Sequence, residues 1–360
     1  MDSLAGHSRA ALEKLGFTKL TEVQEKSIEK AREGKDFWAR SPTGTGKTAA
    51  FMIPIIENAA KDPHYKAIVL EPSRELVIQA ANEARKLAYG TAVRVVAVYG
   101  GTPPEKQEQL VKDGSQIVVG TAERVAEILE RQVLEAVQVR ALVLDEADRL
   151  LTHQFERFVR LIAAKVSKRQ AMLFSVHASD TLLQKARFVL KADFEIVKAG
   201  NVAQSRISHY YSIAKHGLGL KLAQLLEKEP ASERAIVFCA TIEDVEETAG
   251  MLRQNKIFPI VLHSKVLARA RNAAVRRFRQ EGGVLVTTDL AARGMHFDAI
   301  VRVYSLGVPP TPEFYMHRAG RTGRMGASGK CISIVPAEDE KKLKDLFAAN
   351  GISAQPILKD

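Results

Sequence analysis

Two segments of the sequence carry residues that bind phosphate and metal. The first is the run SPTGTGKT at residues 41–48, which follows a short apolar stretch at 37–39 and precedes a helix-forming run at 49–53. A strand, a glycine loop and a helix in this order let backbone N–H groups and the positive helix end surround a phosphate. Lys47 would reach the outer phosphates and the Thr48 hydroxyl would ligate Mg²⁺. This segment predicts a nucleotide-binding loop.

The second segment is the run DEAD at residues 145–148, directly after the apolar run ALVL at 141–144. A parallel sheet presents a metal-binding acid to a bound nucleotide at the end of such a strand. Asp145 is therefore a candidate Mg²⁺ ligand beside Thr48. Either run could occur by chance, but the two together, each in its required context, predict a nucleotide site that uses ATP and Mg²⁺ as cofactors.

A third run, HRAGRTGR at residues 317–324, is rich in arginine. When one domain holds a nucleotide, a second domain can supply arginines that stabilise the negative charge developing on its phosphates. A solvated basic loop or a phosphate clamp would have a similar composition, but Gly320 and Gly323 permit a close backbone approach that solubility does not require. The run predicts an ATPase whose site is complete only when two domains close.

Short β-rich runs alternate with helical segments along the chain, which predicts α/β domains with mainly parallel sheets flanked by helices. The expected strands are 67–70, 93–98, 116–119 and 141–144, with a helix over 74–89, and then 235–238, 257–262, 284–287 and 300–304. A polar break near residues 198–205 separates the two sets. We therefore expect an ATP-binding domain at 1–198, a linker at 199–206 and a second domain at 207–360.

Composition narrows the class of protein. The 360 residues include 53 basic and 42 acidic side chains, a net charge of +11 that favours polyanionic partners, although a merely soluble basic protein would show the same balance. Six basic residues and no acid occur between 265 and 279. The two cysteines, Cys239 and Cys331, lie in apolar runs, so we expect buried thiols and an intracellular, reducing compartment. No run of eighteen apolar residues predicts a membrane span.

Further runs in a fixed order resemble those of the DEAD-box RNA helicases over nearly the whole chain. They are GF at 16–17 with TEVQ at 21–24, PSREL at 72–76, GG at 100–101, TAER at 121–124, IVFCAT at 236–241, TD at 288–289, AARG at 291–294 and the arginine-rich run. The resemblance implies two tandem RecA-like domains, ATP with Mg²⁺, and an RNA strand held through its sugar–phosphate backbone. It implies that Glu146 orients or deprotonates the attacking water.

The resemblance assigns residues to each task. The catalytic set is Lys47, Asp145, Glu146, Arg321 and Arg324. The ATP contacts are Gln24 at the adenine, Thr43, Gly44, Thr45, Gly46, Lys47, Thr48, Arg321 and Arg324. The RNA contacts are Pro72, Ser73, Arg74, Gly101, Thr121, Arg124, Arg271, Thr288 and Arg293. The residues that couple hydrolysis to strand separation are Ser175, His177, His296 and His317.

Several positions depart from the family's pattern. Ser175-Val176-His177 stands in place of Ser-Ala-Thr, and His296 stands where an acid contacts the ribose. Glu123 places a carboxylate beside the expected RNA backbone, and Ala268 replaces a glutamine. These changes fall on coupling and ribose or RNA contacts, whereas the phosphate-handling residues are intact, so the pattern predicts retained ATP and RNA binding with weakened unwinding.

Three functions follow from these observations. The first is an ATP-dependent RNA helicase or RNP-remodelling factor with a monomeric core, acting on RNA with RNP or assembly-factor proteins. The second is an assembly factor, for example in ribosome biogenesis, that clamps RNA and unwinds little. The third is a motor that acts on DNA, because only the resemblance favours RNA.

Overall fold

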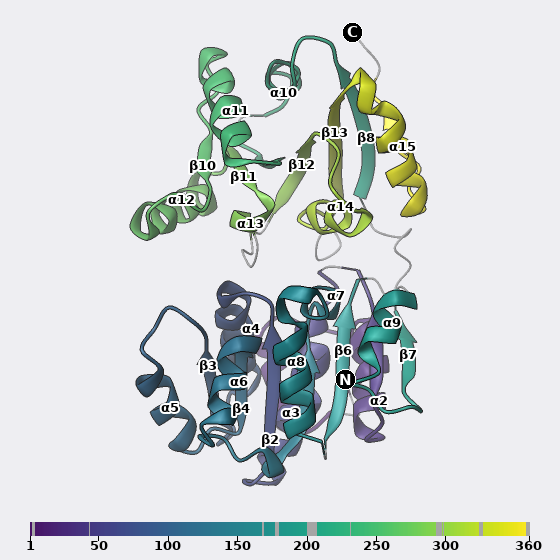
Figure 1. Cartoon of the computed structure of the whole chain (residues 1–360). Helices are drawn as coiled ribbons and strands as arrows, with labels where there is room; N and C mark the ends of the chain where they lie inside the picture. Colours follow the sequence, from purple (N-terminus) through teal and green to yellow (C-terminus); the bar gives the residue numbers. More distant parts are fainter. Residues whose placement is uncertain are drawn as a thin grey trace. The chain divides into compact units, whose positions relative to one another are not determined.

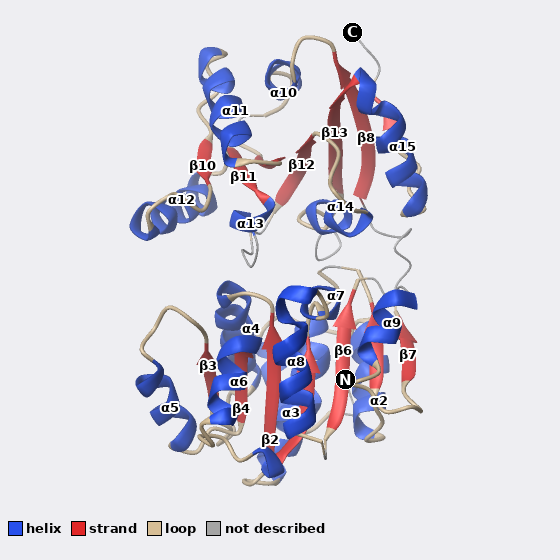
Figure 2. Cartoon of the chain, in the orientation of Figure 1, coloured by secondary structure: helices blue, strands red, loops and turns tan. Residues whose placement is uncertain are grey.

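The chain forms two compact units, Met1–Asn201 (unit one) and Val202–Asp360 (unit two) (Figure 1). The structure is a computed structural model that describes residues 1, 4–42, 44–167, 169–176, 180–199, 207–230, 232–292, 297, 299–323 and 327–357. Each unit contains a seven-stranded sheet in which all paired strands run parallel. The fold class expected from the sequence, two α/β units with parallel sheets flanked by helices, is confirmed (Figure 2).

The sheet of unit one has the strand order β3-β4-β2-β5-β6-β1-β7. Its strands are β1 Phe37–Arg40, β2 Lys66–Glu71, β3 Val95–Val98, β4 Ile117–Thr121, β5 Val139–Leu144, β6 Gln170–Ser175 and β7 Glu195–Lys198. Its helices are α1 Gly6–Lys14, α2 Glu22–Arg32, α3 Lys47–Lys61, α4 Arg74–Leu87, α5 Pro104–Lys112, α6 Ala122–Glu130, α7 Ala147–Leu150, α8 His153–Lys165 and α9 Asp180–Ala186, with a short 3₁₀ turn at Ala136–Gln138.

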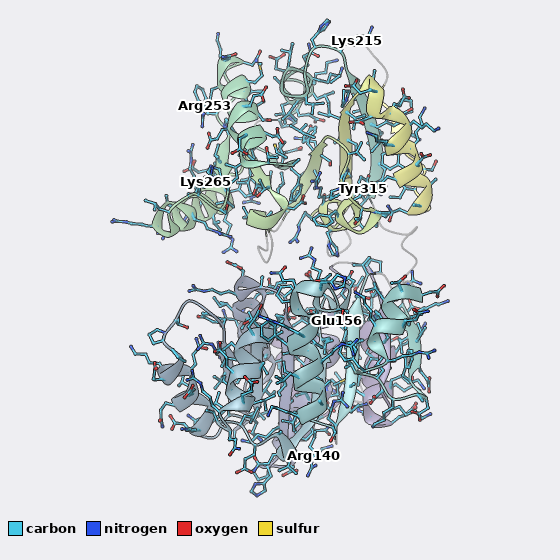
Figure 3. The ribbon with its side chains drawn as sticks, viewed as in Figure 1. Arg140, Glu156, Lys215, Arg253, Lys265 and Tyr315 are labelled. Atoms are coloured by element: carbon cyan, nitrogen blue, oxygen red, sulfur yellow. The ribbon has the colours of Figure 1, made fainter. Side chains whose placement is uncertain are left out.

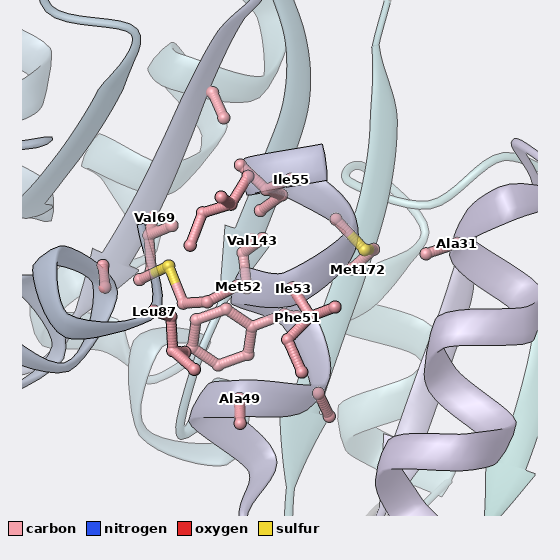
Figure 4. Close-up of a cluster of buried hydrophobic side chains, with 14 of the residues drawn as sticks. Ala31, Ala49, Phe51, Met52, Ile53, Ile55, Val69, Leu87, Val143 and Met172 are labelled. Carbon is pink, nitrogen blue, oxygen red and sulfur yellow. The ribbon is translucent and has the colours of Figure 1, made fainter. Parts of the chain in front are cut away.

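Apolar side chains on both faces explain why the strands of unit one read as continuous hydrophobic runs. Successive residues of one strand point to opposite faces, so Val69 packs with α3 and α4 whereas Ile68 packs with α6 and α8. Figure 4 shows the first of these clusters, where Phe51 and Met52 of α3 meet Val69 and Val143 of the central strands. The core thus fixes α3 against one face of the sheet, beside β2 and β5.

The sheet of unit two has the order β10-β11-β9-β12-β13-β8-β14. Its strands are β8 Ile207–Ala214, β9 Arg234–Cys239, β10 Ile260–Leu262, β11 Val284–Thr288, β12 Ile300–Leu306, β13 Gly329–Pro336 and β14 Gln355–Pro356. Its helices are α10 Leu218–Leu226, α11 Ile242–Gln254, α12 Ala268–Glu281, α13 Asp289–Ala292, α14 Pro312–Ala319 and α15 Glu340–Ala349, with a 3₁₀ turn at Ala337–Asp339. Both cysteines are buried and neither is in a disulfide. Within the described ranges, no helix is long and apolar enough to cross a membrane.

Three elements are shorter than expected by two residues or more at one end. The strand expected at 257–262 begins only at Ile260 because Pro259, just before it, has no N–H to donate to a ladder. The helix expected at 74–89 ends at Leu87, three residues before Gly90, which has a φ of 81°. The strand expected at 93–98 begins at Val95. Strands β6, β7, β8, β13 and β14 were not expected from the sequence.

A half-buried histidine makes the stability of unit two depend on pH. His209 of β8 lies 2.6 Å (Nδ1 to Oη) from Tyr315 of α14, and burial lowers the pKa of His209 to about 4. In the unfolded chain this histidine binds a proton below about pH 6.5, whereas in the folded chain it stays neutral down to about pH 4. Stability is therefore lost as pH falls from about 6.5 to about 4.

We expect that loss to include about 1–3 kcal/mol from His209, and His209→Gln should remove this part. Urea unfolding near pH 7 and near pH 4.5 measures it, with the exposed His216→Gln as the control. An equal loss in the His209 variant and the parent protein would contradict the assignment.

Candidate nucleotide and RNA site

The phosphate loop connects β1 to α3 in unit one. Gly44 and Gly46 have φ values of 74° and 87°, in the left-handed region that favours glycine. A Cβ at Gly46 would also clash with the side-chain amide of Gln24. Because α3 begins at Lys47, the lysine and Thr48 lie in its first turn beside the loop. Thr43, also expected at this site, lies outside the described residues.

The loop is braced by hydrogen bonds of its own. Lys47 Nζ donates to the carbonyl oxygens of Ser41 and Pro42 at 2.9 and 3.1 Å. The hydroxyls of Ser41 and Thr45 are 2.6 Å apart, and Thr45 Oγ1 also donates to the Pro42 carbonyl at 2.9 Å. The ammonium group is thereby held over the loop, where phosphate oxygens could replace the carbonyl oxygens as its partners.

Helix α2 is tied to the same loop through Gln24, whose side chain is fully buried. Gln24 Oε1 accepts from the Thr21 N–H at 2.9 Å and Nε2 donates to the Gly46 carbonyl at 3.2 Å, while Thr21 Oγ1 donates to the Thr45 carbonyl at 2.8 Å. The residue expected at the adenine therefore also positions the phosphate loop, which the sequence motif did not reveal.

Replacing Gln24 with Ala should raise the KM for ATP by about tenfold, because two hydrogen bonds of about 0.5–1.5 kcal/mol each are lost. The preference for ATP over GTP should fall at the same time if Gln24 reads the adenine. Steady-state turnover with both nucleotides measures these effects, and the exposed neighbour Glu25→Ala serves as the control. An unchanged KM for ATP would show that the ties are dispensable.

The acidic run begins at the carboxyl end of β5. The Asp145 N–H donates to the Leu70 carbonyl at 3.1 Å, and Asp145 Oδ1 accepts from the Glu146 N–H at 2.9 Å. Burial raises the pKa of Asp145 to about 6, against the opposing charge of Lys47. Glu146 has φ 48° and ψ 49°, a left-handed conformation that is uncommon outside glycine, and it pairs with Arg149 at 2.8 Å.

A further carboxyl group, Glu71, ends the neighbouring strand β2 and was missed by the sequence reasoning. Only 1% of its surface is exposed, and Oε2 has no hydrogen-bond partner among the described residues. Burial raises the pKa of Glu71 well above its usual range, and the charges of Asp145, Glu146 and Glu83 add to the effect. The signal that could have found it is the one that found Asp145, namely an acid directly after an apolar strand.

The residues expected to contact RNA in unit one gather at the ends of β2, β3 and β4. Ser73 caps α4, and its Oγ accepts from the Leu76 N–H at 3.3 Å. The guanidinium of Arg74 lies 4.8 Å from the centre of the Tyr99 ring, beside Gly101, and Thr121 pairs in register with Glu71. Pro72 lies between Glu71 and Ser73 in the same group.

Two other expected residues of unit one are largely buried. The guanidinium of Arg124 forms an ion pair with Glu127 at 3.1 Å, and the residue is 9% exposed. Ser175, expected in coupling, ends β6, and its hydroxyl accepts from Trp38 Nε1 at 2.8 Å. His177 lies outside the described residues.

In unit two, two of the expected residues form hydrogen bonds with the short helix α13. The Oγ1 of Thr288 accepts from the Ala291 N–H at 3.3 Å, and Arg271 donates to the Ala291 carbonyl at 3.1 Å. His317 lies on α14 and is half-buried, and Arg321 follows that helix. Arg293, His296 and Arg324 fall outside the described ranges.

Arg318 is the residue of the arginine-rich run that the sequence reasoning overlooked. It is 2% exposed and donates to both carboxylate oxygens of Asp289, at 2.9 and 2.6 Å, and to Ser305 Oγ at 2.6 Å. It therefore ties α14 to α13 and β12 from within the core.

Two parallel α/β units, of which unit one has a phosphate loop beside a buried acid, define the class of two-domain, nucleotide-dependent motor proteins. Residues 21–183 match the DEAD/DEAH box helicase family, and residues 220–326 match the helicase conserved C-terminal domain. The ATP-dependent RNA helicase CshA of Listeria monocytogenes is 34% identical over 351 residues, covering 96% of this chain and 68% of the relative.

Solved structures show the same likeness. The chain matches Dbp5 of S. cerevisiae bound to RNA and ADP BeF3 with a TM-score of 0.85 and 25% identity, over 99% of this chain and 94% of that one. It matches Mss116p bound to ssRNA and AMP-PNP with a TM-score of 0.86 and 26% identity, over 99% of this chain and 78% of that one. The chain belongs to the DEAD-box family of RNA helicases, which are ATP-hydrolysing enzymes, so the family and enzyme class predicted from its motifs are confirmed.

Proposed function

We propose that this protein uses the binding and hydrolysis of ATP to remodel RNA, or particles of RNA and protein, through contacts with the RNA backbone. The observation that carries the proposal is the group at the carboxyl end of β5, where buried Asp145 and left-handed Glu146 lie beside the loop that holds Lys47. In this role Lys47 binds the outer phosphates and Glu146 orients or deprotonates the attacking water. Arg321 and Arg324 stabilise the charge on the transferred phosphate.

Magnesium fits the donors present. Burial and the charges of Asp145 and Glu146 raise the pKa of Glu71, and the buried Oε2 of Glu71 lacks a hydrogen-bond partner among the described residues. A divalent cation relieves this concentration of negative charge. Mg²⁺ is usually held by one or two protein oxygens together with phosphate and water, which the Asp145 carboxylate and the Thr48 hydroxyl can supply. When bound, it neutralises charge on the phosphates.

RNA is the proposed macromolecular substrate, bound on unit one by Pro72, Ser73, Arg74, Gly101 and Thr121 at neighbouring strand ends. The backbone N–H groups, hydroxyls and arginine gathered there suit phosphate oxygens and provide no set of groups for reading bases. Binding should therefore depend little on sequence and weaken with salt. The relative CshA is named an RNA helicase, and the matched structures of Dbp5 and Mss116p contain bound RNA. Both likenesses support the same assignment.

An assembly factor that clamps RNA with little unwinding, for example in ribosome biogenesis and together with partner proteins, is the second candidate. One observation favours it. Ser175 is 1% exposed and its hydroxyl accepts a hydrogen bond from Trp38 Nε1, so the coupling segment begins inside the core. The buried thiols of Cys239 and Cys331, neither of which is in a disulfide, support a reducing compartment inside the cell for either candidate.

Strand separation of a short RNA duplex, followed together with ATP turnover, tests the two candidates. The proposed helicase should show RNA-stimulated turnover and ATP-dependent separation of the strands. Turnover without separation would select the clamp. A DNA strand of the same sequence is the third arm, and equal affinity and stimulation by DNA would contradict the assignment to RNA.

A further inference from the structure

A groove on unit two is lined by four arginines and a single acid. It lies between the end of α11, the edge strand β10 and the outer face of α12, and has a volume of about 700 Å³. Arg253, Arg269, Arg276 and Arg277 line it, and Glu281 is the one acid in its lining. Figure 3 labels Arg253 on this flank of unit two.

One of the four groove arginines is paired with an acid. Arg277 and Glu281 form an exposed ion pair at 2.8 Å, which uses the acid of the groove. Among the residues that the structure describes, the side chains of Arg253, Arg269 and Arg276 have no hydrogen bond or ion pair. Arg302, by contrast, is paired with both Glu229 and Glu233. The unpaired guanidinium groups leave a local positive field that an anionic partner would neutralise.

The groove is separate from the expected RNA contact on the same helix. Residues 269, 273, 276 and 280 follow one face of α12, and all four line the groove. Arg271 and Phe278 lie about half a turn away, where Arg271 donates to the Ala291 carbonyl and Phe278 is fully buried. A strand held at Arg271 therefore does not also contact Arg269 and Arg276 through the same nucleotides.

The dimensions and the aromatic neighbour of the groove fit a nucleic-acid strand. Arg269 and Arg276 are seven residues apart, about 10.5 Å along the helix axis, which matches a rise of about three nucleotides at ~3.4 Å each. Phe258, adjacent to the groove-lining Pro259, is 74% exposed and offers a ring on which a base can stack. An acidic peptide would satisfy the charge but would make no use of an exposed ring beside it.

We propose that this groove binds a flanking segment of the same RNA that the protein acts on, through phosphates at Arg253, Arg269 and Arg276 and a base stacked on Phe258. The inference rests on the proposed RNA-dependent function and adds a second, sequence-independent contact to it. It makes affinity depend on RNA length beyond the segment that the motif residues hold.

Binding of labelled RNA to the full chain tests the groove, with a strand of about 8 nucleotides and one of about 25. Arg269→Gln with Arg276→Gln should weaken binding of the long strand about tenfold and lower its salt slope by about 2, and leave the short strand unaffected. Phe258→Ala should weaken long-strand binding without changing the salt slope. Lys342→Gln with Lys344→Gln, on α15 of the same unit, removes the same charge and should leave both strands unaffected.

Several results would overturn the inference. Equal weakening of both strands would place the two arginines in the main RNA contact, and equal weakening in the lysine control would reduce the effect to net charge. Unchanged long-strand binding would remove the groove from RNA recognition, and a loss of polyglutamate binding alone would assign it to an acidic protein segment. RNA-stimulated ATP turnover on the short strand tests the proposed function itself, so failure of the groove and failure of that function are distinguishable.

Discussion

Replacing Glu146 with Gln should lower RNA-stimulated ATP turnover by at least about 100-fold, the usual contribution of a positioned general base. The substitution keeps the length and hydrogen-bonding shape of the side chain but removes its basicity. ATP binding should remain within about threefold, because Lys47 and the loop are unchanged. Turnover and nucleotide binding measured on the same preparation separate the two effects.

The left-handed backbone at Glu146 provides a second variant with a different signature. A non-glycine residue at φ 48° carries strain of about 1–3 kcal/mol, and Glu146→Gly should relieve part of it. This variant should therefore be as inactive as Glu146→Gln but no less stable than the parent protein. Glu130→Gln, an exposed acid at the end of α6, is the matched control for lost charge. Turnover that survives in Glu146→Gln would remove the residue from the chemistry.

The sequence predicted those strands and helices whose residue types and spacing follow the pattern of a buried strand or an amphipathic helix. The run ALVL at 141–144 is short, apolar and followed by an acid, and it forms most of β5. The run ISHYYSIA of β8 is only partly buried, because β8 lies next to the short edge strand β14, so its polar and aromatic residues gave no clear strand pattern. Two residues, as in β14, are too few to give a pattern.

The sequence predicted which residues belong to the candidate site but not the hydrogen bonds that hold them together. The bond from Gln24 to the Gly46 carbonyl joins positions 22 residues apart, and only the packing of α2 against α3 brings them together. Arg318 was overlooked among four neighbouring basic residues of its run. Helical spacing could have found it, because Tyr315, Arg318, Ala319 and Thr322 follow one buried face.

Replacing Arg318 with Met should lower the stability of unit two by about 3–5 kcal/mol, because it leaves the Asp289 carboxylate without its buried partner. Arg131→Met is the matched control, since its pair with Glu108 is exposed and should cost no more than about 1 kcal/mol. The single tryptophan, Trp38, is buried in unit one, so its fluorescence reports on that unit while far-UV circular dichroism reports on both. Urea unfolding of Arg318→Met should shift the dichroism transition and leave the fluorescence midpoint in place.

A double variant decides whether the loss of stability in Arg318→Met comes from the unpaired Asp289 carboxylate or from the other contacts that Arg318 makes. If the unpaired charge is the cause, adding Asp289→Asn to Arg318→Met should recover part of the stability, because no carboxylate is then left buried alone. A double variant that loses the sum of the two single effects would contradict this and assign the cost to the lost packing and to the Ser305 hydrogen bond. A fluorescence midpoint that moves together with the dichroism would show that the two units unfold as one, although each has its own core.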